Sequence, residues 1–172
     1  KGSYISLREV MDEIGTDAAR FFFLMRNTDT HSDFDLELAK KKSLDNPLYY
    51  IQYAHARIWS IFKTAQKSGY TINKIPIENI AFSDEDEKNL IRTLIRFDSV
   101  IDSSIKDLEP NRLIGYLTTL ASEFHSFYAK HKVVDTESKN DTQTRLLIIK
   151  SIQHVLTIGL ETLLGVTAPK EM

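Results

Sequence analysis

The sequence predicts an all-α fold, a helical bundle of about four long helices behind a short helical N-terminal segment. Apolar residues recur at the three- and four-residue spacing of amphipathic helices along nearly the whole chain, and no stretch reads as a strand hairpin. Hydrophobic residues make up 42% of the 172 residues, which is enough for a buried core at this size. Four long helices with short connections usually pack up-and-down.

Two short helices are predicted at the start of the chain. Ser6 begins a capping-box pattern for the first helix, and Gly15 is placed to end it. Thr16 or Asp17 is expected to cap the second helix. The apolar run at residues 21–25 of this helix is expected to be largely buried.

A third short helix is predicted from about Asp35, and the most aromatic helix of the chain follows it. Asn46 is typical of an N-cap, and Pro47 is typical of the first helical residue. This aromatic helix is expected to run to about Ser68, where Gly69 ends it.

The second half of the chain predicts three further long helices. Ser83 is expected to cap the first, a single helix over residues 84–107 with acidic residues in its first turn. Pro110 opens the second, over about residues 111–131, and the third covers about residues 142–164. Together with the aromatic helix, these make up the predicted bundle.

No catalytic residue, bound cofactor or metal site is expected within the chain. The histidines are scattered and form no HExxH-type ligand pair, and no glycine-rich loop is placed to cradle a phosphate. Asp33, Asp35 and Glu37 alternate as in a metal-binding loop, but the glycine and the distal glutamate of an EF-hand are lacking. Helix capping is the favoured role of these acids.

The composition limits the partners and the compartment. The net charge is −2, so the molecule as a whole is drawn neither to nucleic acid nor to an anionic membrane. An RNA reader that relies on stacking and pockets is compatible with this charge. The lack of cysteine excludes disulfides and thiol-ligated zinc and fits a reducing cytoplasm. Apolar runs such as residues 18–25 are too short to cross a bilayer, so no membrane partner is expected.

The stretch NPLYYIQYAHARIW, at residues 46–59, places aromatic side chains all round a helix. One stripe at helical spacing is the natural core face and comprises Leu48, Ile51, His55, Ile58, Trp59 and Phe62. A second stripe comprises Tyr50, Tyr53, Ala54 and Arg57. Three interpretations are open. The first is that the helix packs on both faces, which aromatic stripes most often indicate. The second is a platform on which RNA bases stack, and the third is a protein-binding surface.

A second cluster of aromatic and basic residues occurs in FHSFYAKHKVV, at residues 124–134. Its phenylalanines suit the core, while Tyr128, His131 and Lys132 can share another face of the helix. On spacing alone, this is an ordinary solvated helix end with basic residues near its negative pole. The cluster gains a functional meaning only if it lies near the second stripe of the aromatic helix.

The residues GTDAARFFFLMRNTDTHSDFDLELAKKKSLDNPLYYIQYAHARIWSI, at 15–61, closely resemble the start of the C-terminal anticodon-binding domain of arginyl-tRNA synthetases. The family's Asp-Ala-Leu-Arg signature corresponds to Asp17-Ala18-Ala19-Arg20, with alanine in place of leucine. The NPxYYxQYAHAR block follows the signature in the right order and at the right distance. GLETLLGVTAPKEM resembles the family's C-terminus, and KGSYISLREVMDEIG resembles the segment after the KMSKS-type loop, so the resemblance covers the whole chain.

The resemblance implies one anticodon-binding domain over residues 1–172, in which residues 1–15 are a remnant that links from a missing catalytic domain. The abrupt start at Lys1 fits such a fragment. The implied protein is an arginine–tRNA ligase whose catalytic domain uses ATP and Mg²⁺, and the complete enzyme is expected to be cytoplasmic and monomeric. The implied partner of this domain is the anticodon stem-loop of an arginine tRNA.

The resemblance also implies RNA-binding residues by motif position. Tyr50, Tyr53 and Arg57 would contact loop bases, while Tyr128 and Met172 would surround the central anticodon cytosine. Lys132, at a position that alternates between aromatic and basic residues in the family, is included with them. Two alternatives are kept: a protein–protein interaction bundle, and the anticodon-binding domain of another class I synthetase, such as the cysteinyl or methionyl enzyme.

Overall fold

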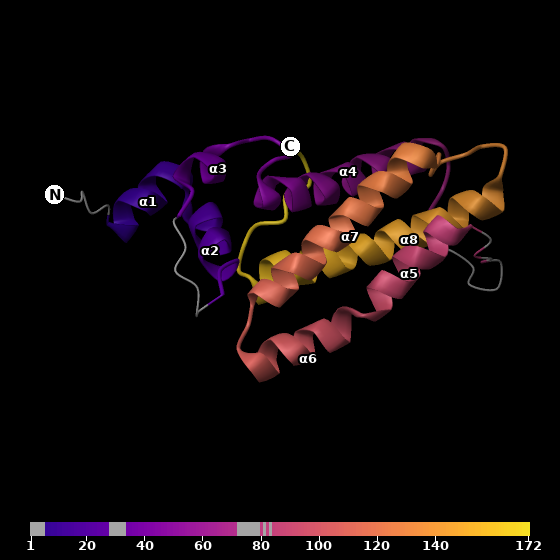
Figure 1. Cartoon of the computed structure of the whole chain (residues 1–172). Helices are drawn as coiled ribbons and strands as arrows, with labels where there is room; N and C mark the ends of the chain where they lie inside the picture. The colour runs from indigo at the N-terminus through magenta and orange to yellow at the C-terminus, as the bar shows by residue number, and fades with distance from the viewer. Residues whose placement is uncertain (1–5, 28–33, 72–79, 81, 83) are drawn as a thin grey trace.

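The computed structural model describes residues 6–27, 34–71, 80, 82 and 84–172, and within these residues the all-α prediction is confirmed. A group of short helices precedes a bundle of longer ones (Figure 1). The first group comprises α1 (Leu7–Ile14), α2 (Thr16–Leu24) and α3 (Leu36–Lys40). The bundle comprises α4 (Pro47–Lys67), α5 (Glu85–Ile95), α6 (Phe97–Asp107), α7 (Asn111–Lys130) and α8 (Lys139–Thr157), which a π-helical turn, η2 (Ile158–Leu163), continues.

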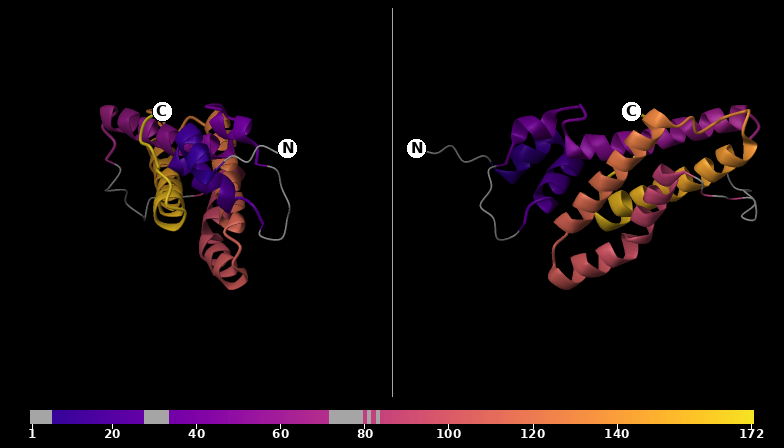
Figure 2. Two further views of the ribbon diagram at one scale, coloured as in Figure 1. Left: turned by 90° about the vertical axis from the view of Figure 1, so that its left-hand side faces the viewer. Right: turned by 45° about the vertical axis from the view of Figure 1, so that its right-hand side comes forward.

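Helix α4 packs against both α7 and α8, and α5 packs against the same two helices. The short N-terminal helices extend from the end of the bundle at which α4 begins, as the right-hand view of Figure 2 shows. The core between the long helices includes the fully buried side chains of Ile51, Ile58, Leu117, Leu120, Phe124, Ile149 and Ile152. Because α4 has a neighbour on two sides, it carries apolar and aromatic residues on more than one face.

Most of the predicted helix caps are confirmed. The Ser6 and Glu9 side chains each accept from the other residue's backbone N–H, and Gly15 has a φ of +83° after α1. The Asn46 side chain accepts the first N–H groups of α4. The predicted cap of α2 is wrong, since Gly15 is its N-cap and neither Thr16 nor Asp17 makes a side-chain cap bond.

The single helix predicted over residues 84–107 is wrong, because it breaks at Arg96 into α5 and α6. At the break, the Thr93 carbonyl oxygen accepts from the Tyr116 hydroxyl at 3.1 Å, and the Phe97 ring stacks on Tyr116 with ring centroids 5.7 Å apart. These contacts with α7 redirect the chain at a point where the local pattern stays helical. Asp84 caps α5, and the predicted cap Ser83 lies outside the described residues.

The apolar run at residues 21–25 is only partly buried. Phe21 and Phe22 are fully buried, whereas Phe23 on α2 is 49% exposed. A helix turns by about 100° per residue, so five consecutive side chains cannot all face one core.

The last helix of the bundle forms an apolar segment longer than the apolar runs noted in the sequence. Residues Lys139–Leu163 are long and apolar enough to cross a membrane by length and composition alone. In this structure, however, the segment packs against α4 and α5, and Ile149, Ile152 and Leu156 are fully buried. It is therefore accounted for as the core helix of the bundle.

The close packing of η2 on α7 supplies a stability test. A Cβ added at Gly159 would lie 2.7 Å from Cδ2 of Leu117, which is fully buried. We expect Gly159→Ala to lower the free energy of unfolding by about 1–3 kcal/mol, the usual cost of overpacking a core. Gly115→Ala on α7, where a Cβ meets nothing within 4 Å, should raise it by up to about 1 kcal/mol. Urea unfolding of both variants measures the difference, and a Gly159→Ala protein as stable as the wild type would contradict the close contact.

Candidate nucleic-acid interface

Residues 165–172, here called the C-terminal strap, leave η2 and run back past α2 to α4 (Figure 1). Arg20 on α2 donates from Nη1 to the Gly165 carbonyl oxygen at 3.2 Å. The Asp17 carboxylate accepts from the Thr167 N–H at 2.9 Å. Both α2 residues belong to the four-residue signature seen in the sequence, so in this structure the signature holds the strap.

Helix α4 holds the strap from its other side. Gln52 donates to the Thr167 carbonyl oxygen at 2.8 Å, and Nδ1 of His55 lies 2.7 Å from the Pro169 carbonyl oxygen. Because a carbonyl oxygen can only accept, Nδ1 carries the proton, which leaves Nε2 as an acceptor 3.0 Å from the Thr157 hydroxyl and 3.3 Å from the Gln153 side-chain nitrogen. Burial lowers the pKa of His55, in keeping with a neutral ring. His55 is thus buried, as predicted from its place in the core stripe, and it also hydrogen-bonds to the strap.

The end of the strap completes a hollow beside α4. This hollow is lined by residues that include Tyr53, Arg57, Ser60, Lys63, Lys170 and Met172. A second hollow lies between α4 and the end of α7, and its lining includes Ser60, Thr64, Tyr128, Lys130 and Lys132. Ser60 borders both hollows, so they form one surface, here called the α4–α7 groove.

Arg57 joins the two helices at the centre of the groove. Its guanidinium donates to the Tyr53 hydroxyl and lies 5.2 Å from the Tyr53 ring centroid and 5.5 Å from the Tyr128 ring centroid. The hydrogen bond with Tyr53 raises the pKa of Arg57, so the group stays charged. A planar cation between two tyrosine rings offers flat surfaces and donors together, which is the combination that binds unstacked bases.

The structure brings together most of the residues that the resemblance implied. Tyr53, Arg57 and Met172 line the first hollow, and Tyr128 and Lys132 line the second. Tyr50 lines neither hollow; its ring packs on His125, with ring centroids 4.8 Å apart, and against the core. Ala54, from the same stripe as Tyr50, is fully buried.

His125 on α7 is a groove-supporting residue that sequence reasoning missed. Its ring contacts both Tyr50 and Tyr53, the latter at a centroid distance of 5.6 Å. Burial lowers its pKa, and its Nε2 is buried with no hydrogen-bond partner among the described residues. Its position three residues before Tyr128 on the same helix face was the available signal.

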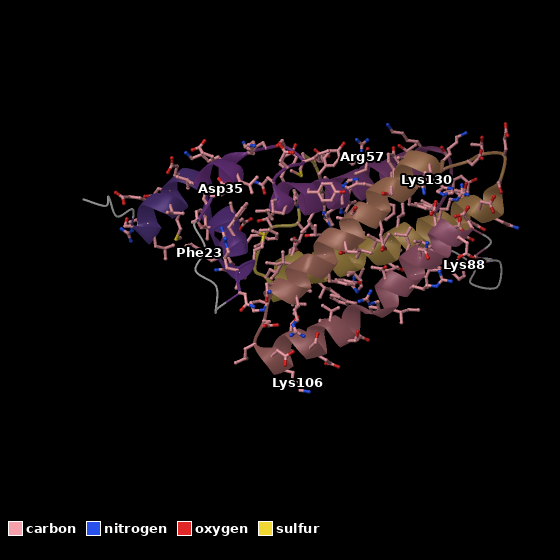
Figure 3. The ribbon with its side chains drawn as sticks, viewed as in Figure 1. Phe23, Asp35, Arg57, Lys88, Lys106 and Lys130 are labelled. Atoms are coloured by element: carbon pink, nitrogen blue, oxygen red, sulfur yellow. The ribbon has the colours of Figure 1, made fainter. Side chains whose placement is uncertain are left out.

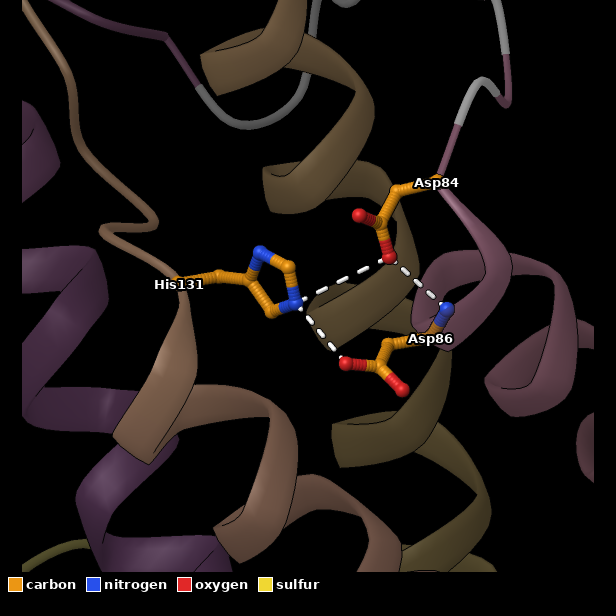
Figure 4. Close-up of side chains that lie close together, drawn as sticks. All are labelled: Asp84, Asp86 and His131. Atoms are coloured by element: carbon orange, nitrogen blue, oxygen red, sulfur yellow. Dashed lines mark hydrogen bonds and ion pairs between the residues drawn. The ribbon is translucent and has the colours of Figure 1, made fainter.

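Three side chains come close enough together to be tested as a metal site. Nε2 of His131 lies 3.0 Å from Oδ2 of Asp86 and 3.7 Å from Oδ1 of Asp84 (Figure 4). The Lys130 ammonium already lies 3.0 Å from the same Asp86 oxygen, and Asp84 caps α5. The cluster is therefore explained as a set of ion pairs and hydrogen bonds that connect the end of α7 to the start of α5.

Comparison with known proteins identifies the family to which the chain belongs. The family model described as the DALR anticodon binding domain matches residues 51–172. The chain is 46% identical to the arginine–tRNA ligase of Geobacter metallireducens and 44% identical to that of Lawsonia intracellularis, over 99% of its own length in each case. It spans only 30% and 31% of the length of these two relatives.

Solved structures agree with the sequence relatives. A structure described as an arginyl-tRNA synthetase of Campylobacter jejuni superposes with a TM-score of 0.81 at 33% identity, over 99% of this chain and 36% of that one. The arginyl-tRNA synthetase of Thermus thermophilus gives a TM-score of 0.73 at 25% identity, over 99% of this chain and 28% of that one. The chain therefore belongs to the DALR anticodon-binding domain family and corresponds to that domain of the arginine–tRNA ligases.

Proposed function

We propose that this chain binds the anticodon stem-loop of an arginine tRNA in the α4–α7 groove, on behalf of a longer arginine–tRNA ligase. In that protein, ATP and Mg²⁺ would act in a separate catalytic domain, and the enzyme would be a cytoplasmic monomer. Residues 1–172 would work as one domain, with residues 1–15 as the connection to the catalytic part. The observation that carries the proposal is the placement of Arg57 between Tyr53 and Tyr128, beside the end of the strap.

The chemistry of the groove suits a single-stranded loop. Tyr53 is half-buried and Tyr128 is 38% exposed, so a base would contact the part of each ring that Arg57 and the neighbouring aromatic rings leave open. Each stacked base would contribute about 1–3 kcal/mol. Hydroxyl and backbone groups near Met172 and Ser60 could hydrogen-bond the edge of a pyrimidine, which would supply base specificity. Such recognition needs little overall positive charge, so the net charge of −2 does not oppose it.

Truncating one ring tests the stacking role. We expect Tyr53→Ala to weaken binding of a fluorescein-labelled anticodon stem-loop of an arginine tRNA about tenfold to a hundredfold, because one stacked base is lost. Phe23→Ala is the matched control, since it removes an exposed ring on α2, away from Arg57 (Figure 3). Fluorescence anisotropy measures the affinities and circular dichroism the melting temperature. Equal affinities for both variants, with both proteins folded, would count against the proposal and favour a protein-binding surface.

Exchanging the central cation tests its planar geometry. We expect Arg57→Lys to weaken RNA binding about fivefold or more while the salt dependence of binding stays the same, because lysine keeps the charge but cannot stack flat between two rings. Titrations of the same RNA at several salt concentrations separate the two effects. A lysine variant that binds as tightly as the wild type would show that Arg57 acts only as a point charge.

A further inference from the structure

The α4–α7 groove has a charge pattern unlike that of the whole molecule. Its cations are Arg57, Lys63, Lys130, Lys132 and Lys170, whereas Glu171 carries the only acidic side chain among the described residues that line the two hollows. Two of these cations also have a carboxylate partner outside the lining, since Lys130 pairs with Asp86 and Lys132 with Asp135. The chain as a whole has a net charge of −2. A local excess of cations beside aromatic rings is expected where a polyanion lies along a surface.

The one acidic side chain in the lining of the groove, Glu171, is paired with Lys63. Glu171 lies next to the end of the strap, and its carboxylate accepts from the Lys63 ammonium. Both side chains remain open to solvent, with 77% and 56% of their surface exposed. An ion pair this exposed is weak, so another anion can replace the carboxylate at little cost.

Lys63 lies in line with the stacking residues. Tyr53, Arg57, Ser60 and Lys63 follow one another at four- and three-residue spacing on one face of α4. Lys63 stands about 9 Å further along the helix axis than Arg57. Lys170 differs from it, because its ammonium lies 4.6 Å above the Trp59 ring. Among the cations of the first hollow, Lys63 alone combines an exposed ammonium with an acidic partner that can be exchanged.

We propose that Lys63 binds a backbone phosphate of the RNA, and that Glu171 occupies the phosphate position until the RNA displaces it. The inference rests on the proposed function and adds a subsite for a phosphodiester group to it. Glu171 would then set the affinity of the groove by competing with the RNA backbone. No bond is made or broken in this exchange, since one oxyanion replaces another at the same ammonium.

Charge-removing variants of the protein in which this chain occurs test the exchange. The probe is the labelled arginine-tRNA stem-loop, titrated over a range of salt concentrations. We expect Lys63→Gln to reduce the slope of log K against log salt by about 0.7, the contribution of one phosphate contact to a single strand. Lys106→Gln makes the same charge change on α6, far from Arg57 in Figure 3, and should leave the slope as in the wild type.

Removing the competitor should have the opposite effect. We expect Glu171→Gln to tighten RNA binding about twofold to fivefold at low salt, which is the scale of one exposed ion pair. This gain should vanish when Lys63→Gln is already present. An unchanged slope in Lys63→Gln, or a Glu171→Gln gain that persists in the double variant, would overturn the inference. Loss of the Tyr53 dependence would instead overturn the proposed function, so the two failures can be told apart.

Discussion

The hydrogen bonds that hold the C-terminal strap against α2 and α4 fix the geometry on which the groove depends. Arg20 and Asp17 bind residues that lie 145 and 150 positions later in the chain. Gln52 and His55 bind the same strap from α4. Since Val166 and Ala168 are buried in the hydrophobic core, the strap is packed as well as hydrogen-bonded. These contacts bring the end of the strap, with Met172, beside the groove.

The same contacts give the signature in α2 a physical meaning. Asp17 lies in the first turn of α2, where the positive end of the helix dipole stabilises a negative charge. Its carboxylate also accepts from the Thr167 N–H of the strap. Arg20 points to a carbonyl at the start of the strap, where Gly165 has a φ of +64°. A left-handed conformation at that point favours glycine and turns the chain toward α2. The N-terminal helices thus act on the groove through the strap, since none of their described residues lines it.

Local patterns predicted the parts of the fold that local contacts decide. The caps at Ser6 and Asn46 follow from side chains that reach backbone groups two or three residues away, and sequence spacing records such distances. The break at Arg96 depends on Tyr116 of another helix, and no spacing within residues 84–107 encodes it.

In the candidate site, too, some features follow from spacing in the sequence, whereas others depend on contacts between distant residues. Helical spacing placed Tyr53 and Arg57 on one helix face and Tyr128 and Lys132 on another, and the family resemblance added Met172. The fold brings these residues to the same groove. The orientation of Tyr50 depends on His125, a residue on a helix that the sequence alone does not position against α4. Lys63 and its partner Glu171 are 108 positions apart, so their pairing was visible only in three dimensions.

The most direct test of the central claim removes the hydrogen bonds from α2 to the strap and leaves the groove residues unchanged. The measurement is the affinity of the stem-loop RNA for the Asp17→Ala/Arg20→Ala variant, with and without deletion of Met172. If the strap positions the groove, the variant should bind as weakly as the Met172 deletion, and combining the two should cost nothing more. Wild-type affinity in a folded Asp17→Ala/Arg20→Ala protein would contradict this account.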